Sequence, residues 1–129
     1  MRRLALLPLF AIALACGGGG LLGDSENYPR TENLSVEFRN TSATPAEMWL
    51  EPDAQAGSDV AGGATRTMTR ATTWTKSDDT IIFRFHAFKP GLLRSANAEL
   101  SINGHEAHAE NFDGFIATWN GTTLSVTTK

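Results

Sequence analysis

Apolar and polar side chains alternate along one short segment after another from Leu34 onward, and this pattern restricts the fold more than any other feature of the chain. In the clearest segment, Ile81 to Phe88, the odd-numbered positions are Ile, Phe, Phe and Ala. Successive side chains of a strand point to opposite faces, so the pattern predicts half-buried strands. Threonine is abundant and no helical period is visible, so we expect an all-β fold.

The strands should assemble into two packed sheets. Turn signals such as Lys89-Pro90-Gly91 separate the segments, and about seven or eight short strands at this spacing favour a two-sheet antiparallel β-sandwich. A small barrel is the alternative. By this pattern the chain looks like an immunoglobulin-like or fibronectin-III-like module. The expected inward positions are Val36, Phe38, Met48, Leu50, Ala96, Ala98, Leu100 and Ile102.

Two Asn-Gly pairs predict tight hairpins, because a type I′ turn needs positive φ at both central residues. At Asn120-Gly121, a two-residue turn places Trp119 opposite Thr122 and brings Phe115, Ala117, Leu124 and Val126 onto one face.

At Asn103-Gly104, the same turn pairs Leu100 with Ala107 and places His108 beside Glu99. His105 and His108 then point to opposite faces and cannot chelate one ion. A helical turn, which would bring the two histidines together, is the alternative at this point.

The segment from Thr65 to Thr75 is apolar on neither face. We therefore expect an edge strand with Arg66 and Arg70 exposed, because charged side chains on an edge discourage aggregation.

Cys16, the single cysteine, follows an N-terminal segment with two arginines and an uncharged apolar run from Leu4 to Leu14. Such a segment is typical of a secretory signal, and the run is shorter than the roughly 20 residues that span a bilayer. Ile12-Ala13-Leu14-Ala15-Cys16 resembles the lipobox of bacterial lipoproteins, although Ala13 stands where leucine is usual. The resemblance implies cleavage before Cys16, acylation of that cysteine and anchoring in membrane lipid. Because Gly17 follows, it implies the outer membrane of a Gram-negative cell.

Three regions follow from these patterns. Residues 1–15 should form the signal peptide, residues 16–33 a lipidated, Gly-rich tether, and residues 34–129 the sandwich domain. A tether of this length has a reach of roughly 20 Å. The alternative is that part of it packs on the domain through Leu21, Leu22 or Tyr28.

The formal net charge of −3 and the absence of a basic cluster argue against a nucleic-acid partner. The sequence shows no nucleophile elbow, P-loop or dinucleotide fingerprint, so we predict no catalytic residue, metal ligand or cofactor. Loop carboxylates that could gather calcium are better explained as solvated charges. These are Glu51, Asp53, Asp59, Asp78 and Asp79.

The tryptophans are the remaining indication of binding, because exposed tryptophan stacks on sugars or anchors protein interfaces. Trp49 should lie on the face opposite Met48 and Leu50, and Trp119 beside a turn, so both are candidate ligand contacts. We expect a non-catalytic module that binds or scaffolds an envelope protein or glycan; the sequence does not give its oligomeric state. The alternatives are a metal-handling lipoprotein and an enzyme with a pocket lined by His86 or His105.

Overall fold

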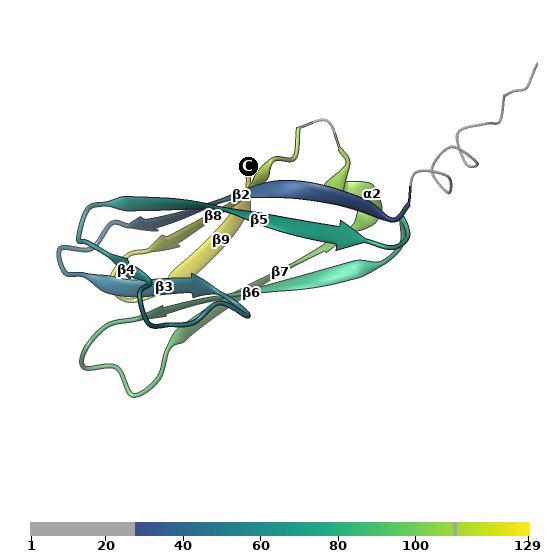
Figure 1. Cartoon of the computed structure of the whole chain (residues 1–129). Helices are drawn as coiled ribbons and strands as arrows, with labels where there is room; N and C mark the ends of the chain where they lie inside the picture. The colour runs from purple at the N-terminus through teal and green to yellow at the C-terminus, as the bar shows by residue number, and fades with distance from the viewer. Residues whose placement is uncertain (1–27, 110) are drawn as a thin grey trace, which may run out of the picture.

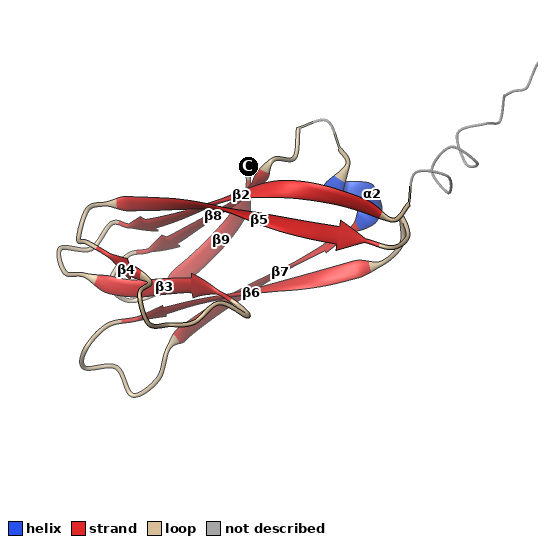
Figure 2. Ribbon diagram, in the orientation of Figure 1, coloured by secondary structure: helices blue, strands red, loops and turns tan. Residues whose placement is uncertain are grey.

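A computed structural model describes residues 28–109 and 111–129 of the chain. The regular secondary structure of the described part is strand, apart from one short helix (Figures 1 and 2). Its elements are β2 (Arg30–Asn40), β3 (Ala46–Leu50), β4 (Asp59–Val60), β5 (Thr65–Trp74), β6 (Thr80–Phe88), β7 (Ala96–Asn103), α2 (Gly104–Ala107), β8 (Gly114–Trp119) and β9 (Leu124–Thr128).

The strands form two four-stranded sheets, in the orders β5-β2-β8-β9 and β4-β3-β6-β7, which lie face to face (Figure 1). The predicted all-β, two-sheet sandwich is therefore confirmed. One pair departs from the predicted antiparallel arrangement, because β2 and β8 run parallel. These strands are far apart in sequence, and a parallel pair requires such a long connection.

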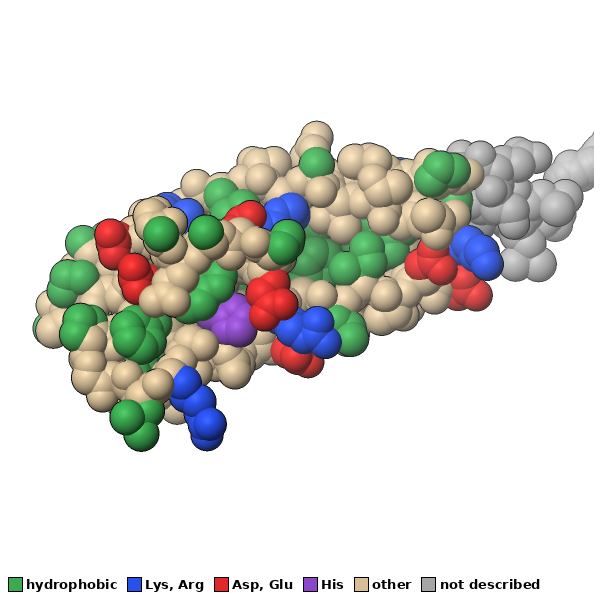
Figure 3. Space-filling model, turned by 60° about the horizontal axis from the view of Figure 1, so that its bottom comes forward, with side chains coloured by type: hydrophobic (Ala, Val, Ile, Leu, Met, Phe, Trp, Pro, Cys, Tyr) green, Lys and Arg blue, Asp and Glu red, His purple; other side chains and the backbone are tan. Residues whose placement is uncertain are grey.

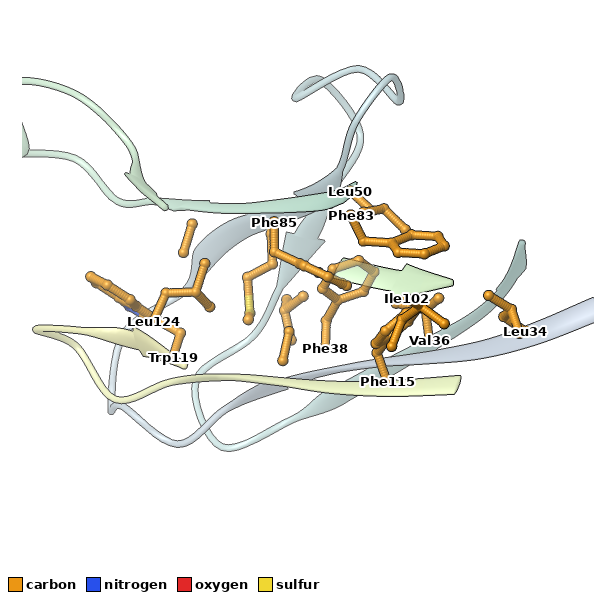
Figure 4. Close-up of a cluster of buried hydrophobic side chains, with 14 of the residues drawn as sticks. Leu34, Val36, Phe38, Leu50, Phe83, Phe85, Ile102, Phe115, Trp119 and Leu124 are labelled. Atoms are coloured by element: carbon orange, nitrogen blue, oxygen red, sulfur yellow. The ribbon is translucent and has the colours of Figure 1, made fainter. Parts of the chain in front are cut away.

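The alternation in the sequence places the core between the sheets. Val36 and Phe38 of β2, and Phe83 and Phe85 of β6, are buried, and their side chains meet in the interior (Figure 4). The inward positions predicted on β2, β3 and β7 are confirmed as buried or half-buried. The aromatic rings pack edge-on or tilted, as in the pair Phe85–Phe115, a geometry that aromatic pairs favour.

The C-terminal hairpin β8–β9 forms, but its register is shifted by two residues from the prediction. Trp119 pairs with Leu124, and Ala117 pairs with Val126. The connection is a four-residue loop because the Asn120 side-chain oxygen accepts hydrogen bonds from two backbone N–H groups farther along the loop. A shift of two keeps every side chain on its predicted face.

The hairpin predicted at Asn103-Gly104 is wrong, and so are the pairings Leu100–Ala107 and Glu99–His108. The chain instead enters α2, and β7 pairs with β6. The Asn103 side chain accepts from the Glu106 backbone N–H while the Glu106 carboxylate accepts from the Asn103 N–H. This reciprocal capping box begins a helix where a turn was expected. The alternative of a helical turn is the observed state.

Gly104 is also fixed by packing. A Cβ at this position would lie 2.5 Å from the carbonyl oxygen of Lys76, so only glycine permits α2 to approach the loop between β5 and β6 this closely.

Strand β5 lies at the edge of its sheet, as predicted. The prediction that Arg66 and Arg70 are exposed is wrong, because both are half-buried and point towards the other sheet. Arg66 donates to the carbonyl oxygen of Met48 at 2.5 Å and lies over the Phe38 ring. Arg70 donates to the Leu50 carbonyl and to the Asp53 carboxylate. Inward-pointing charges are another way to protect an edge strand.

The N-terminal boundary of the sandwich lies earlier than the sequence pattern indicated. Strand β2 begins at Arg30, within the segment predicted as tether, and Tyr28 packs against the core. The predictions on Cys16, the signal peptide and the rest of the tether fall on residues 1–27, outside the described residues. Among the described residues, no helix has the length and apolar character needed to cross a membrane.

Candidate binding face on one sheet

Three polar or aromatic side chains form a row across the outer face of the sheet β4-β3-β6-β7. Trp49 of β3 pairs directly with His86 of β6, which pairs with Asn97 of β7. The three strands bring together positions that are far apart in the sequence. Because directly opposed residues share a face, all three project away from the core. Trp49 lies opposite Met48 and Leu50, as predicted, and is half-buried.

The imidazole of His86 is held on three sides. Its ring stacks on the Trp49 indole, with ring centroids 5.0 Å apart and planes inclined by 17°. Its Nε2 lies 2.5 Å from Glu51 Oε2, and its Nδ1 lies 2.6 Å from Asn97 Oδ1. Each ring nitrogen therefore has a side-chain oxygen within hydrogen-bond distance. The His86 side chain is 15% exposed, so the ring is fixed in place but still reaches the surface.

A second row borders the first. Arg84 of β6 donates to Glu99 of β7 at 2.8 Å, and the Arg84 carbonyl accepts from the Glu51 backbone N–H. The Arg84 and Glu99 side chains are about half exposed, so this ion pair contributes little to stability. We refer to Trp49, Glu51, Arg84, His86, Asn97 and Glu99 together as the Trp49 face.

Figure 3 shows a histidine on one face of the sandwich, with hydrophobic, acidic and basic side chains beside it. Such a surface offers an aromatic ring for stacking and both donors and acceptors for hydrogen bonding. Their positions are set by contacts within the protein, so ordering them on binding costs little entropy. The arrangement is suited to recognising a ligand.

The other two tryptophans lie in the core. Trp119, the second candidate ligand contact, is 1% exposed. The shifted register of the β8–β9 hairpin makes it a strand residue opposite Leu124, rather than a residue beside the turn. Trp74 is fully buried, and its indole N–H donates to the Ile102 carbonyl at 3.1 Å. Trp49 is therefore the one tryptophan with a side chain at the surface.

The histidines near α2 have separate environments. His105 is exposed. His108 is largely buried, with its Nδ1 2.8 Å from the Tyr28 hydroxyl and its Nε2 3.0 Å from Glu32 Oε2. The predicted neighbour of His108, Glu99, instead pairs with Arg84. His108 thus contacts Tyr28, the first described residue, and Glu32 of β2.

Three of the loop carboxylates have individual partners. Glu51 contacts His86, Asp53 pairs with Arg70 at 2.6 Å, and Asp79 accepts from the Thr75 hydroxyl. The Thr75 hydrogen bond lowers the pKa of Asp79. Within residues 28–109 and 111–129, no cluster of three or more His, Cys, Asp or Glu side chains has a geometry that could hold a metal ion.

Sequence reasoning identified Trp49 but missed the residues assembled around it. The parity of Glu51 relative to Trp49 was visible in the sequence, and so was the outward position of His86 on its strand. The pairing of β3 with β6, which brings Glu51 and His86 together, was not visible in the sequence, because β4 and β5 lie between these two strands in the chain. A comparison of the chain with known protein families, curated proteins and solved structures found no match.

Proposed function

We propose that this chain is a lipid-anchored protein of the bacterial cell envelope, that its sandwich is a non-catalytic binding module, and that the Trp49 face engages an envelope protein or glycan. The observation that carries the binding role is the row formed by Trp49, His86 and Asn97. It combines an aromatic ring at the surface with polar groups whose positions the fold already sets. Tryptophan in such a setting is typical of the centre of a binding site.

The anchor rests on the lipobox-like segment that ends at Cys16. Acylation of this cysteine and of the new amino terminus supplies more than one lipid chain, which is the condition for firm anchoring. In this proposal the Gly-rich stretch between Cys16 and the start of β2 at Arg30 is the tether, which gives the domain a reach of roughly 20 Å.

Membrane fractionation tests the anchor. We expect the wild-type protein to partition with membranes and to carry a lipid adduct detectable by mass spectrometry, whereas Cys16→Ser should leave a protein that is released in aqueous buffer. A Cys16→Ser protein that stays anchored as firmly as wild type contradicts the lipoprotein assignment.

Binding to immobilised envelope material tests the Trp49 face. Wild type, Trp49→Ala and Thr67→Ala are applied to a glycan array and to envelope extracts. Thr67 is a matched control because it lies on an exposed outer position of the other sheet. We expect Trp49→Ala to weaken binding by about thirtyfold or more, because a loss of about 2 kcal/mol defines an interface hot spot. Equal retention by Trp49→Ala and wild type removes this face from the proposal.

A further inference from the structure

A groove opens where β3 begins and β6 ends, next to the Trp49 face. It has a volume of about 260 Å³, and a neighbouring hollow shares two of its prolines. The residues that line it, called the Phe88 groove below, are Pro45, Ala46, Glu47, Asp59, Phe88 and Pro90. This end of the sandwich is opposite the end where the described chain begins, because β2 starts at Arg30 and reaches Asn40 here.

The Phe88 groove combines apolar walls with acidic groups at its edge. Its proline, alanine and phenylalanine side chains provide the apolar surface. The Glu47 carboxylate accepts from the Gln55 amide at 2.6 Å. The Asp59 side chain is exposed and has no hydrogen bond or ion pair within the part of the chain that the structure describes. The groove is therefore suited to an apolar side chain that is followed by a positive charge.

The loop between β6 and β7 presents that combination. It projects from the same end of the sandwich (Figure 1). Leu92 packs against the core and fixes the loop, whereas the next residue, Leu93, is 103% exposed. Arg94 is exposed and has no ion pair among residues 28–109 and 111–129. A fixed loop thus presents a fully exposed leucine beside an unpaired cation.

We propose that two copies of this chain associate through this end, with Leu93 of each copy in the Phe88 groove of the other and Arg94 facing Asp59. Pro90 lines the groove and lies in the loop, so the donor and acceptor surfaces adjoin. The same surface patch on both copies generates a closed, two-fold dimer rather than an open chain. This inference does not depend on what the Trp49 face binds.

The dimer is weak. One leucine on each side buries far less than the roughly 1,600 Å² of a standard interface. Confinement on a membrane surface raises the effective concentration and strengthens such a contact. The association is therefore sensitive to single side chains.

Sedimentation equilibrium tests the proposal with the full chain carrying Cys16→Ser, which removes the one thiol and with it any disulfide-linked dimer. Neutral detergent keeps the apolar N-terminal segment from associating. We expect a concentration-dependent dimer, and we expect Leu93→Ser to weaken it by about tenfold or more, since a buried leucine is lost.

Ile82→Ser is the matched control, because Ile82 is the other large hydrophobic side chain exposed in the described part of the chain. It lies six residues from Phe88 on β6, roughly 20 Å away, so its loss should leave the dimer unchanged. A wild type that stays monomeric at millimolar concentration overturns the proposal. So does an equal effect of Ile82→Ser and Leu93→Ser.

Charge reversal tests the second contact. Arg94→Glu alone should weaken the dimer, and Arg94→Glu combined with Asp59→Lys should restore it towards the wild-type value. These residues are exposed, so neither change should disturb the fold. Failure of the double variant to recover any association contradicts the proposed pairing of Arg94 with Asp59.

Discussion

One outer face of the sandwich carries mainly threonine and serine, whereas the other carries an aromatic and charged network. On the sheet β5-β2-β8-β9, Glu37 pairs with Arg39 on its own strand and with Lys129 at the end of the described chain. On the other sheet, Glu51, His86 and Asn97 connect three strands. The outward hydroxyl residues of the first sheet are Thr31, Ser35, Thr65, Thr67, Thr69, Thr73, Thr118, Ser125 and Thr127.

The contrast shows that alternation decides which side chains face out, but not what the face does. Threonine on the outer face favours the strand, and its hydroxyl contacts join directly opposed residues, as between Thr31 and Thr73 at 2.7 Å. The Trp49 face joins residues that are distant in sequence, and each holds the next in place. We therefore expect substitutions on the two outer faces to differ in their effect on binding. Substitutions in the core between the sheets should destabilise the whole sandwich and so affect both faces equally.

The largest expected effect comes from the shared core. Phe85 is fully buried and contacts both Phe38 and Phe115 across the interface between the sheets. Phe85→Ala should lower the free energy of unfolding by about 3–5 kcal/mol, measured by urea denaturation. A loss below about 1 kcal/mol would mean that the two sheets do not depend on this contact.

The next effect concerns the polar connection between the sheets. Asn40, at the end of β2, is 1% exposed and donates to the carbonyl oxygens of Thr44 and Val60. Asn40→Ala leaves these carbonyls without that donor and should destabilise the fold by about 1–3 kcal/mol. Ser42→Ala is the control, because Ser42 also donates to the Thr44 carbonyl but is less buried. An equal loss of stability in Asn40→Ala and Ser42→Ala would contradict the expectation that the more buried hydrogen bonds contribute more.

A smaller effect compares the two outer faces directly. Trp49→Ala removes the stacking on His86 and should cost about 1 kcal/mol of stability. Thr67→Ala, on the outer face of the sheet β5-β2-β8-β9, should change stability by no more than about 0.5 kcal/mol. Thermal melts of the two variants check this. Equal losses would show that the Trp49 face is no more ordered than the other.

The smallest effect depends on pH. Hydrogen bonds from Lys129 and Arg39 lower the pKa of Glu37 from its usual 4.5. The unfolded state then binds more protons in this range, so the carboxylate contributes stability above pH 4.5 and loses it as pH falls through the lowered pKa. The difference in melting temperature between wild type and Glu37→Gln should be present at pH 6 and should shrink towards pH 3. A difference that grows on acidification contradicts this assignment.

The fold could be predicted from the sequence largely because its signals are local. The alternation in β6 and the faces of β8 and β9 depend on neighbouring residues alone. The capping box at Asn103 was also present in the sequence, but Asn-Gly favoured a hairpin more strongly. In the structure the capping box forms, and Gly104 packs closely against Lys76 in the loop between β5 and β6.

The candidate site could be predicted only in part, since it depends on strand pairing. Trp49 was identified from its parity, but its stacking partner lies on a strand 37 residues farther along the chain. The inward direction of Arg66 likewise depends on the acceptor that β3 of the other sheet offers. Such contacts are set by the packing of the two sheets, which period-two patterns do not encode.

Site-specific photo-crosslinking in the cell envelope tests most directly whether the two outer faces differ in function. A photoreactive residue is placed at Ser101 of β7 or at Thr69 of β5; both positions are exposed, carry a hydroxyl and lie on the edge strand of their sheet. We predict adducts with an envelope component other than the chain itself at position 101, lost in Trp49→Ala, and none at position 69. Adducts at position 69 alone, or equal adducts at both positions, would contradict the account.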